Sequence, residues 1–372
     1  MYGERRQDGA DDETEESRQS EAQHPSTVRS DAGSSSVTDV FRRGRFGRRL
    51  GVKIYYGAGH EQFPPSGLLR HAQLAAEVGF DGIACSDHFQ PWWEPGESGH
   101  AWPWLGALGA STSDVELGTA VTPAVRRYHP ALVAQAFATL EDLFPGRVFL
   151  GYGSGESLNE SPFGYDWPSG EEQLEMMDEA LDMIRRLWNG ETIATGTKHF
   201  PTKDAKLHSR PAQPPSLYVS AFHEGAAKVA AEYGDGIWTL GDPESVPGLI
   251  ETYRGAGGGG EIILQALVSW AATDEAALEG ARKWKGAQPP EYYVEDWHDP
   301  QRMYEHAEET ISDDEFRQGA VISADPAEHV KRLEQLVELG ATTIAVMNCS
   351  GADPEGAIRV YGEQVLPKLK RA

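Results

Sequence analysis

The chain has 372 residues, of which 39% are hydrophobic and 9% aromatic. This length allows two domains or one large barrel, and the apolar content excludes a wholly disordered chain. The 58 acidic and 33 basic side chains leave a net charge of -25, which repels phosphate backbones and anionic lipid heads, so we expect neither nucleic acid nor membrane as a partner.

The sequence shows no apolar run of about 18 residues and no apolar N-terminal signal. We therefore expect a cytoplasmic protein. Cys85 and Cys349 both lie in apolar, strand-like contexts, which favours buried free thiols over a disulfide and leaves too few ligands for a zinc cluster. Arg outnumbers Lys, and an acidic, Lys-poor surface suits work at high salt. A halophilic source is one hypothesis, and ordinary acidity is the alternative.

Residues 1–50 are rich in Ser, Asp, Glu and Arg and show no apolar period. This composition predicts a disordered N-terminal tail. The Arg cluster from Arg42 to Arg49 could contact an acidic partner, but a solvated tail is the simpler interpretation.

Residues 51–372 predict a single domain, because short runs of β-branched and aromatic residues alternate there with segments of helical period. The eight predicted strands are 52–56, 80–85, 115–121, 147–153, 216–222, 235–240, 261–270 and 342–348. Such an alternation predicts an α/β fold, a (β/α)8 TIM barrel with insertions. The main insertion is expected at about 284–320, where Pro and aromatic residues break the period.

A barrel of this kind places its active site on the loops that follow its strands. Polar and aromatic residues gather after the predicted first, second and fourth strands, with Glu61, His88, Trp92 and Glu156 among them. Together they would supply a general acid or base and flat faces for a planar ligand. Taken singly, each has a structural alternative: a helix cap, a satisfied loop histidine or a packed lid.

Two competing interpretations of these loops are weaker. A metal site could use His60, His88, His100 and His129, but no H-x-H or H-E-x-x-H spacing supports it, so no metal is expected. The Gly-rich segment 151–156 lacks the third Gly of a dinucleotide fingerprint. We interpret its glycines as allowing the backbone to approach a flat ligand while presenting Glu156.

Several segments match one known family in order. HEQFPP, CSDHFQPW, GTAVTPAVRRYHPALVAQAFATL, FPGRVFLGYGSGESLNE and AAEYGDGI lie between Val52 and Leu240, and VISADPAEHVKRL follows near the C-terminus. With these motifs the sequence resembles the bacterial luciferase-like superfamily, in the clade of the F420-dependent glucose-6-phosphate dehydrogenases. The resemblance implies a luciferase-like TIM barrel, a flavin-type cofactor (FMN or coenzyme F420) and a homodimer.

The resemblance also implies roles for individual residues. The clade's catalytic residues fall on His88, Trp92, Glu61 and Glu156. His88 would move a proton while hydride passes between substrate and cofactor ring, and Trp92 and an acid would stabilise the charge. A cis peptide bond between Ala120 and Val121 would support the ring. Cofactor contacts are implied for Asp87, Thr119, Ala120, Val121, Asn159, Ser220, Ala221, Phe222 and His223.

Two departures from the clade affect cofactor and substrate. Phe222 and His223 stand where relatives have a Gly-Gly pair that closes around the F420 tail, and Asp242 stands in or near the place of the relatives' phosphate-binding Lys. A carboxylate facing a phosphate is repulsive, which argues against glucose 6-phosphate. The departures resemble a sister group that uses FMN, and they favour FMN over F420.

We therefore expect a flavin- or deazaflavin-dependent oxidoreductase that acts on a small, uncharged or weakly charged organic substrate. With FMN, hydride uptake would lead to oxygen activation, as in luciferase-like monooxygenases, or to direct reduction of the substrate. The alternatives are an F420-dependent alcohol or sugar dehydrogenase, a non-catalytic flavin or deazaflavin carrier, and a metal-dependent barrel hydrolase.

Overall fold

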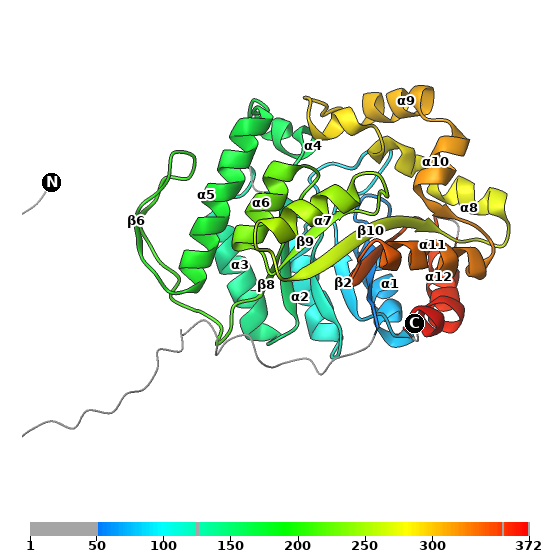
Figure 1. Cartoon of the computed structure of the whole chain (residues 1–372), viewed down its shortest axis with the longest axis horizontal. Coiled ribbons are helices and arrows are strands. Elements are labelled where there is room, and N and C mark those ends of the chain that lie inside the picture. Colours follow the sequence, from blue (N-terminus) through cyan, green and yellow to red (C-terminus); the bar gives the residue numbers. More distant parts are fainter. Residues whose placement is uncertain (1–50, 124–125, 352, 371–372) are drawn as a thin grey trace, which may run out of the picture. The chain divides into compact units, whose positions relative to one another are not determined.

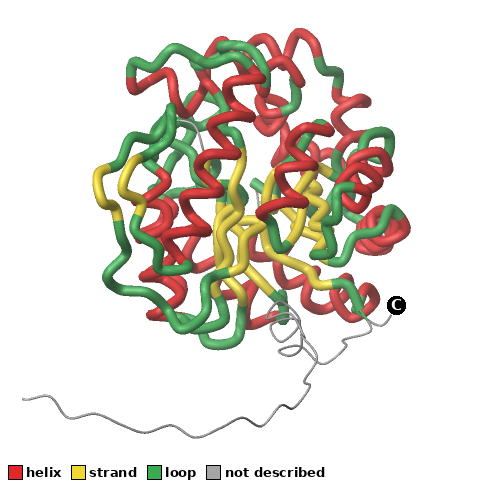
Figure 2. The backbone as a smooth tube through the Cα atoms, turned by 60° about the vertical axis from the view of Figure 1, so that its left-hand side comes forward, coloured by secondary structure: helices red, strands yellow, loops and turns green. Residues whose placement is uncertain are grey.

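The computed structural model describes residues 51–123, 126–351 and 353–370, so the predicted tail and its Arg cluster lie outside the described residues. Eight parallel strands close into a barrel, because β1 pairs with both β2 and β12. Figure 1 and Figure 2 show the helices around these strands. The barrel strands are β1 (Lys53–Ala58), β2 (Gly82–Cys85), β3 (Glu116–Thr119), β5 (Val148–Gly153), β8 (Ser216–Ser220), β9 (Gly236–Leu240), β10 (Glu261–Ser269) and β12 (Thr343–Asn348).

Helices follow the strands and cover the outside of the barrel (Figure 2). They include α1 (Pro65–Val78), α2 (Ala101–Ser111), α3 (Pro130–Leu143), α5 (Gly170–Trp188), α6 (Glu224–Tyr233), α7 (Val246–Gly255), α8 (Asp274–Ala281), α11 (Pro326–Glu338) and α12 (Pro354–Val360). Local sequence fixes their ends: α1 begins at a Pro and stops at Gly79, whose φ of 103° suits glycine. Near the C-terminus the chain continues into the π-helix η5 (Tyr361–Val365) and α13 (Leu366–Leu369).

Alternating residues of each strand build two apolar layers. On β1, Ile54 and Tyr56 face outward and join the core beneath the helices, whereas Tyr55 faces the barrel interior. Tyr55 stacks on Phe149 with ring centroids 5.4 Å apart, in an inner layer that also includes Trp238. This layer fills the middle of the barrel, as the period of two in a strand requires.

The prediction of a TIM barrel is confirmed, with local differences. The third predicted strand ends early, at Thr119, and a short strand β4 (Thr122–Pro123) then pairs with β5. The structure also contains a hairpin that the sequence did not predict, formed by β6 (Ile193–Thr195) and β7 (Lys203–Ala205). Both cysteines are buried free thiols, as expected. No helix among the described residues is long and apolar enough to cross a membrane.

The region predicted as the main insertion is helical rather than irregular. Its elements are η3 (Arg282–Ala287), η4 (Pro290–Tyr293), α9 (Pro300–Thr310) and α10 (Asp313–Gly319), followed by β11 (Val321–Ile322). Aromatic side chains that broke the helical period in the sequence form a separate core here, with Trp284 and Tyr292 packed against Trp92 and Trp93 from the β2 loop. The insertion therefore builds one wall of the barrel mouth.

Candidate active site

A cavity of about 450 Å³ lies at the carboxyl ends of the barrel strands, in the size range of small-molecule sites. All four residues predicted as catalytic line it: Glu61, His88, Trp92 and Glu156. Five of the predicted cofactor contacts line it as well: Ala120, Val121, Ser220, Phe222 and His223. The structure thus brings most of the predicted site residues to one cavity.

Glu61 is held by one carboxylate oxygen and presents the other to His88. Its Oε2 accepts a hydrogen bond of 2.7 Å from the Ser86 hydroxyl, which in turn accepts one of 2.9 Å from the backbone N–H of His60. Its Oε1 lies 3.6 Å from His88 Nδ1. That nitrogen is buried and has no hydrogen-bond partner among the described residues. The pair is therefore preoriented for proton exchange without being locked together.

Aromatic rings enclose His88 on one side. The Trp92 ring lies 5.2 Å from the imidazole and 5.7 Å from the Tyr293 ring, which belongs to the insertion. Burial and the nearby charges of Glu156 and Glu61 raise the pKa of Tyr293, so its hydroxyl stays protonated. Tyr293 and Trp284 are lining residues that sequence reasoning missed, because nothing in the irregular 284–320 pattern indicated which side chains return to the mouth.

Glu156 directly precedes the short helix α4 (Ser157–Glu160), which is followed by the 3-10 turn η2 (Ser161–Phe163). Its Oε2 accepts a hydrogen bond of 3.2 Å from the amide of Asn159. Asn159 is fully buried, and its Oδ1 accepts a 2.7 Å hydrogen bond from the backbone N–H of Phe89. Asn159 thus ties the loop after β5 to the loop that carries His88.

Four residues implied to contact the cofactor do not line the cavity: Asp87, Thr119, Asn159 and Ala221. Asp87 is 1% exposed, and its two carboxylate oxygens are occupied by Thr122 at 2.8 Å and Arg127 at 3.1 Å. The Thr119 hydroxyl donates to the carbonyl oxygen of Gly151 at 3.0 Å. These bonds assign the residues to the wall behind the cavity, and their predicted cofactor contacts stay predictions.

The peptide bond between Ala120 and Val121 is cis, as the resemblance implied. Strand β5 packs closely against the residues on either side of this bond. A Cβ added to Gly153 would lie 2.7 Å from the Val121 side chain, and one added to Gly151 would lie 2.0 Å from the Thr119 carbonyl oxygen. Gly151 and Gly153 therefore allow β5 to approach the end of β3 and the residues that follow it.

The cavity is short of positive charge. Two carboxylates, Glu61 and Glu156, line it, and none of its described lining residues is Lys or Arg. Lys285 lies next to the lining residue Trp284, but its buried ammonium group pairs with Asp313 at 2.5 Å. Asp242, expected near a phosphate site, does not line the cavity. Its carboxylate accepts hydrogen bonds from the backbone N–H groups of Glu244 and Ser245, in the turn that precedes α7.

The histidines of the metal interpretation have separate roles. His100 and His129 accept hydrogen bonds as N-caps of α2 and α3. His60 is fully buried beside Trp104, and burial lowers its pKa to about 4 against the opposing charges of Glu61 and Asp87. It is thus a neutral core histidine at physiological pH.

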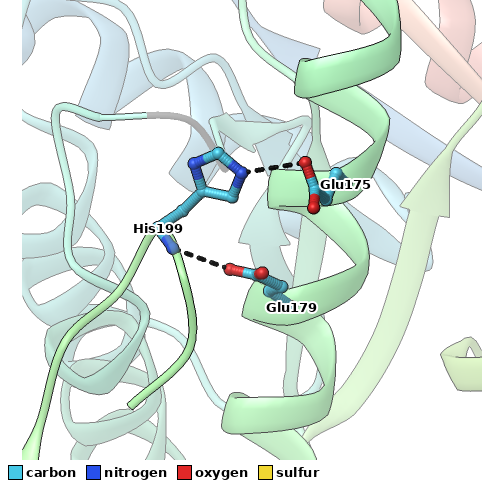
Figure 3. A group of neighbouring side chains, drawn as sticks. All are labelled: Glu175, Glu179 and His199. Carbon is cyan, nitrogen blue, oxygen red and sulfur yellow. Dashed lines mark hydrogen bonds and ion pairs between the residues drawn. The ribbon is translucent and has the colours of Figure 1, made fainter.

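A group with metal-ligand chemistry lies elsewhere, between α5 and the β6–β7 hairpin. Figure 3 shows His199 beside Glu175 and Glu179. The oxygen of Glu175 that meets His199 also binds the ammonium group of Lys198 at 2.7 Å. Because the ammonium group of Lys198 already balances the charge of this cluster, we do not assign it as a metal site.

Comparison with known proteins agrees with this geometry. The model of the luciferase-like monooxygenase family matches residues 46–343. The chain is 38% identical to an F420-dependent glucose-6-phosphate dehydrogenase of Microbacterium testaceum over 331 residues, covering 86% of this chain and 98% of the relative. The same figures for identity and coverage hold for a relative of that name from Beutenbergia cavernae.

Solved structures show the same fold. An F420-dependent secondary alcohol dehydrogenase, solved with an F420-acetone adduct, is 31% identical with a TM-score of 0.81, covering 86% of this chain and 99% of that one. A monooxygenase from Streptomyces bottropensis shares the fold at 22% identity and a TM-score of 0.65, with 85% and 99% covered. The sequence match and the barrel agree, and the chain belongs to the luciferase-like monooxygenase family.

Proposed function

We propose that this chain is an oxidoreductase that passes hydride between a flavin-type cofactor, FMN or F420, and a small uncharged organic substrate. The observation that carries the proposal is the unpartnered, buried Nδ1 of His88, which faces Glu61 inside a cavity walled by Trp92. An unsatisfied buried nitrogen of this kind has capacity left for a ligand.

The cavity has the chemistry that a flavin-type ring requires. Ala120 and Val121 offer an apolar surface on one side, and Trp238 and Met347 line the cavity as well. Apolar and aromatic walls with a few polar groups are typical of cofactor sites. When bound, the ring supplies the atom that accepts or donates hydride.

The protein's own residues would manage charge and protons around that transfer. His88 can take a proton from a substrate hydroxyl or return it, because an imidazole ring can both accept and donate a proton. Glu61, fixed by Ser86, stabilises the positive charge that His88 then carries. Glu156 provides a second carboxylate in the same cavity, and the Trp92 and Tyr293 rings keep water from His88.

The charge of the cavity favours an uncharged substrate such as a secondary alcohol or ketone. A phosphate dianion on a substrate held at His88 would lie beside Glu61 and Glu156, and none of the described lining residues is a Lys or Arg that could pair with it there. The solved dehydrogenase with an acetone adduct shows that a relative at 31% identity acts on a substrate of this class. We therefore propose a substrate different from glucose 6-phosphate.

Two observations bear on the cofactor in opposite directions. The relatives at 38% identity and the solved structure at 31% identity carry F420 in their names, which supports F420. Phe222 and His223 line the cavity where F420-dependent relatives are expected to have a Gly pair, and the half-exposed Phe222 ring packs against Tyr293. That obstruction supports FMN and, with it, monooxygenase chemistry as the second candidate function.

One experiment separates these possibilities. Purified protein is denatured, the mass of the released cofactor is measured, and the protein loaded with that cofactor is offered 2-propanol, cyclohexanol and glucose 6-phosphate. We expect a mass of FMN or F420 and turnover of an uncharged compound. Rapid cofactor reduction by glucose 6-phosphate would contradict the substrate proposal, and failure to bind either cofactor would contradict the function as a whole.

Three further predictions remain proposals: a cytoplasmic location, a homodimer and adaptation to high salt. One experiment tests the last two, because an acidic chain of this kind should gain stability as salt screens its self-repulsion. Sedimentation at several salt concentrations reports both assembly and compactness. A monomer that stays folded without added salt would contradict the last two.

A further inference from the structure

Both peptide groups that flank His88 form hydrogen bonds with side chains from other loops. The carbonyl oxygen of Asp87, which belongs to the peptide group before His88, accepts a 2.5 Å hydrogen bond from Arg127. The N–H of Phe89, which belongs to the peptide group after His88, donates to Asn159 at 2.7 Å. The backbone of His88 is therefore held on both sides.

Arg127 is fixed at both of its ends. The same guanidinium nitrogen that binds the Asp87 carbonyl also donates to the Asp87 carboxylate at 3.1 Å, and the side chain is 5% exposed. Its guanidinium carbon lies 4.6 Å from the centre of the Tyr128 ring. Its backbone N–H donates at 2.5 Å to the buried carboxylate of Glu160.

From this arrangement, and building on the function proposed above, we infer that Arg127 is a positioning residue for His88. Its guanidinium group donates a hydrogen bond to the Asp87–His88 peptide group, and its backbone N–H donates one to Glu160 at the end of α4. Arg127 thus connects the backbone of His88 to α4. Arg127 itself does not line the cavity, so it acts through His88 and not on the substrate.

The consequence for catalysis follows from the loose contact between His88 and Glu61. Their atoms are 3.6 Å apart and share no hydrogen bond, so the orientation of the imidazole depends on its backbone. Misplacing a catalytic group by about 1 Å can cost about 100-fold in rate. Weakening the hydrogen bond between Arg127 and the Asp87 carbonyl oxygen should therefore slow the proton transfer. The residues that line the cofactor cavity should stay in place.

The neighbouring Arg126 provides a matched control. Its side chain is 32% exposed and forms a surface ion pair of 3.4 Å with Glu172, away from Asp87. Arg127→Lys keeps the charge but loses the planar guanidinium group that lies over the Tyr128 ring. Because an unpaired Asp87 could destabilise the fold, the double variant Arg127→Met with Asp87→Asn removes both charges together.

The test compares these variants with Arg126→Met in the cofactor-loaded protein. We expect Arg127→Lys and the double variant to lower kcat about 10- to 100-fold and to change its pH profile. Arg127→Lys, which leaves Asp87 in place, should also keep the cofactor dissociation constant within about twofold. Arg126→Met should keep wild-type values. Equal kcat in all variants, or a loss of cofactor binding with a normal rate per bound cofactor, would overturn the inference.

A second readout does not depend on turnover. The imidazole resonance of His88 is identified by NMR from its loss in His88→Gln, and its chemical shift is compared between Arg127→Lys and Arg126→Met without cofactor. A shift in the first variant alone supports the positioning role, even if no substrate is found. An unchanged His88 resonance in Arg127→Lys would overturn it, whereas a lack of turnover by the wild type would count against the proposed function only.

Discussion

Two of the regions that pair histidine with glutamate, the cavity and the cluster around His199, differ in whether their polar atoms have partners. In the cluster of Figure 3, His199 Nε2 lies 3.1 Å from Glu175, closer than the 3.6 Å between His88 and Glu61. Yet the Glu175 side chain is 46% exposed and also binds Lys198, whereas that of Glu61 is 2% exposed. The shorter contact thus lies at the surface, where the ammonium group of Lys198 also balances the charge of Glu175.

This comparison shows that distance does not identify the functional pair. Water and Lys198 already balance the charges around Glu175, so the interaction there is screened and weak. In the cavity, His88 Nδ1 is buried with no partner among the described residues. Low dielectric makes an unpaired polar group costly, and a ligand or a moving proton can relieve that cost.

The largest expected effect separates the two histidines directly. His88→Ala should keep the cofactor but lose about 100- to 10,000-fold in turnover, because general acid or base assistance is typically worth that much. His199→Ala, the matched control, should change turnover less than twofold. Single-turnover reaction of the cofactor-loaded variants is the measurement.

A normal rate per bound cofactor in His88→Ala would remove His88 from the mechanism and leave Glu61 or Glu156 as the proton carrier. If His199→Ala lost as much as His88→Ala, the contrast between buried and surface pairs would fail altogether.

A smaller effect concerns His60, which is fully buried behind the site. Burial lowers its pKa from 6.5 to about 4, so between these values the unfolded chain binds a proton that the folded chain does not. Its contribution to stability is therefore lost as pH falls below about 6.5, at up to about 1.4 kcal/mol per pH unit. His60→Phe keeps a ring against Trp104 and should flatten the pH dependence of the unfolding free energy between pH 6 and pH 5. Denaturant melts at both pH values check this, and an unchanged slope would show that His60 is already charged or solvated in the fold.

The smallest expected effect belongs to the surface cluster. Glu175→Gln removes the negative charge that pairs with His199 and Lys198, but exposed ion pairs contribute little to stability. The melting temperature should be indistinguishable from that of the wild type in moderate salt. A clear loss of stability, or a metal-dependent gain that this variant abolishes, would mean that the cluster is more than a solvated ion pair.

Much of the fold and of the site follows from local sequence. Strand runs with interleaved helical periods predicted the eight-stranded barrel, and Glu61, His88 and Glu156 converge because loops after parallel strands meet at one mouth. The conformation of a loop is less predictable. Asp87 and His88 are adjacent in sequence, but one turns into the wall and the other into the cavity.

Long-range contacts set the remaining features. Trp284 and Tyr293 reach the mouth from a segment without a period, and they do so because η3 and η4 pack on the Trp-rich loop after β2. The hydrogen bond between Arg127 and the Asp87 carbonyl oxygen joins residues that are 40 positions apart in the sequence. Pairings of this kind depend on how loops pack in three dimensions, so the motif around Arg127 could not reveal its partner.

The central claim is that the cavity lined by His88, whose buried Nδ1 has no hydrogen-bond partner among the described residues, holds a flavin-type cofactor. The most direct test is the melting temperature of the wild-type protein with saturating FMN and, separately, with saturating F420. A ligand at about 100 times its dissociation constant adds about 2.7 kcal/mol to the folded state, so at least one cofactor should raise the melting temperature clearly. If neither does so, the account of this cavity is contradicted.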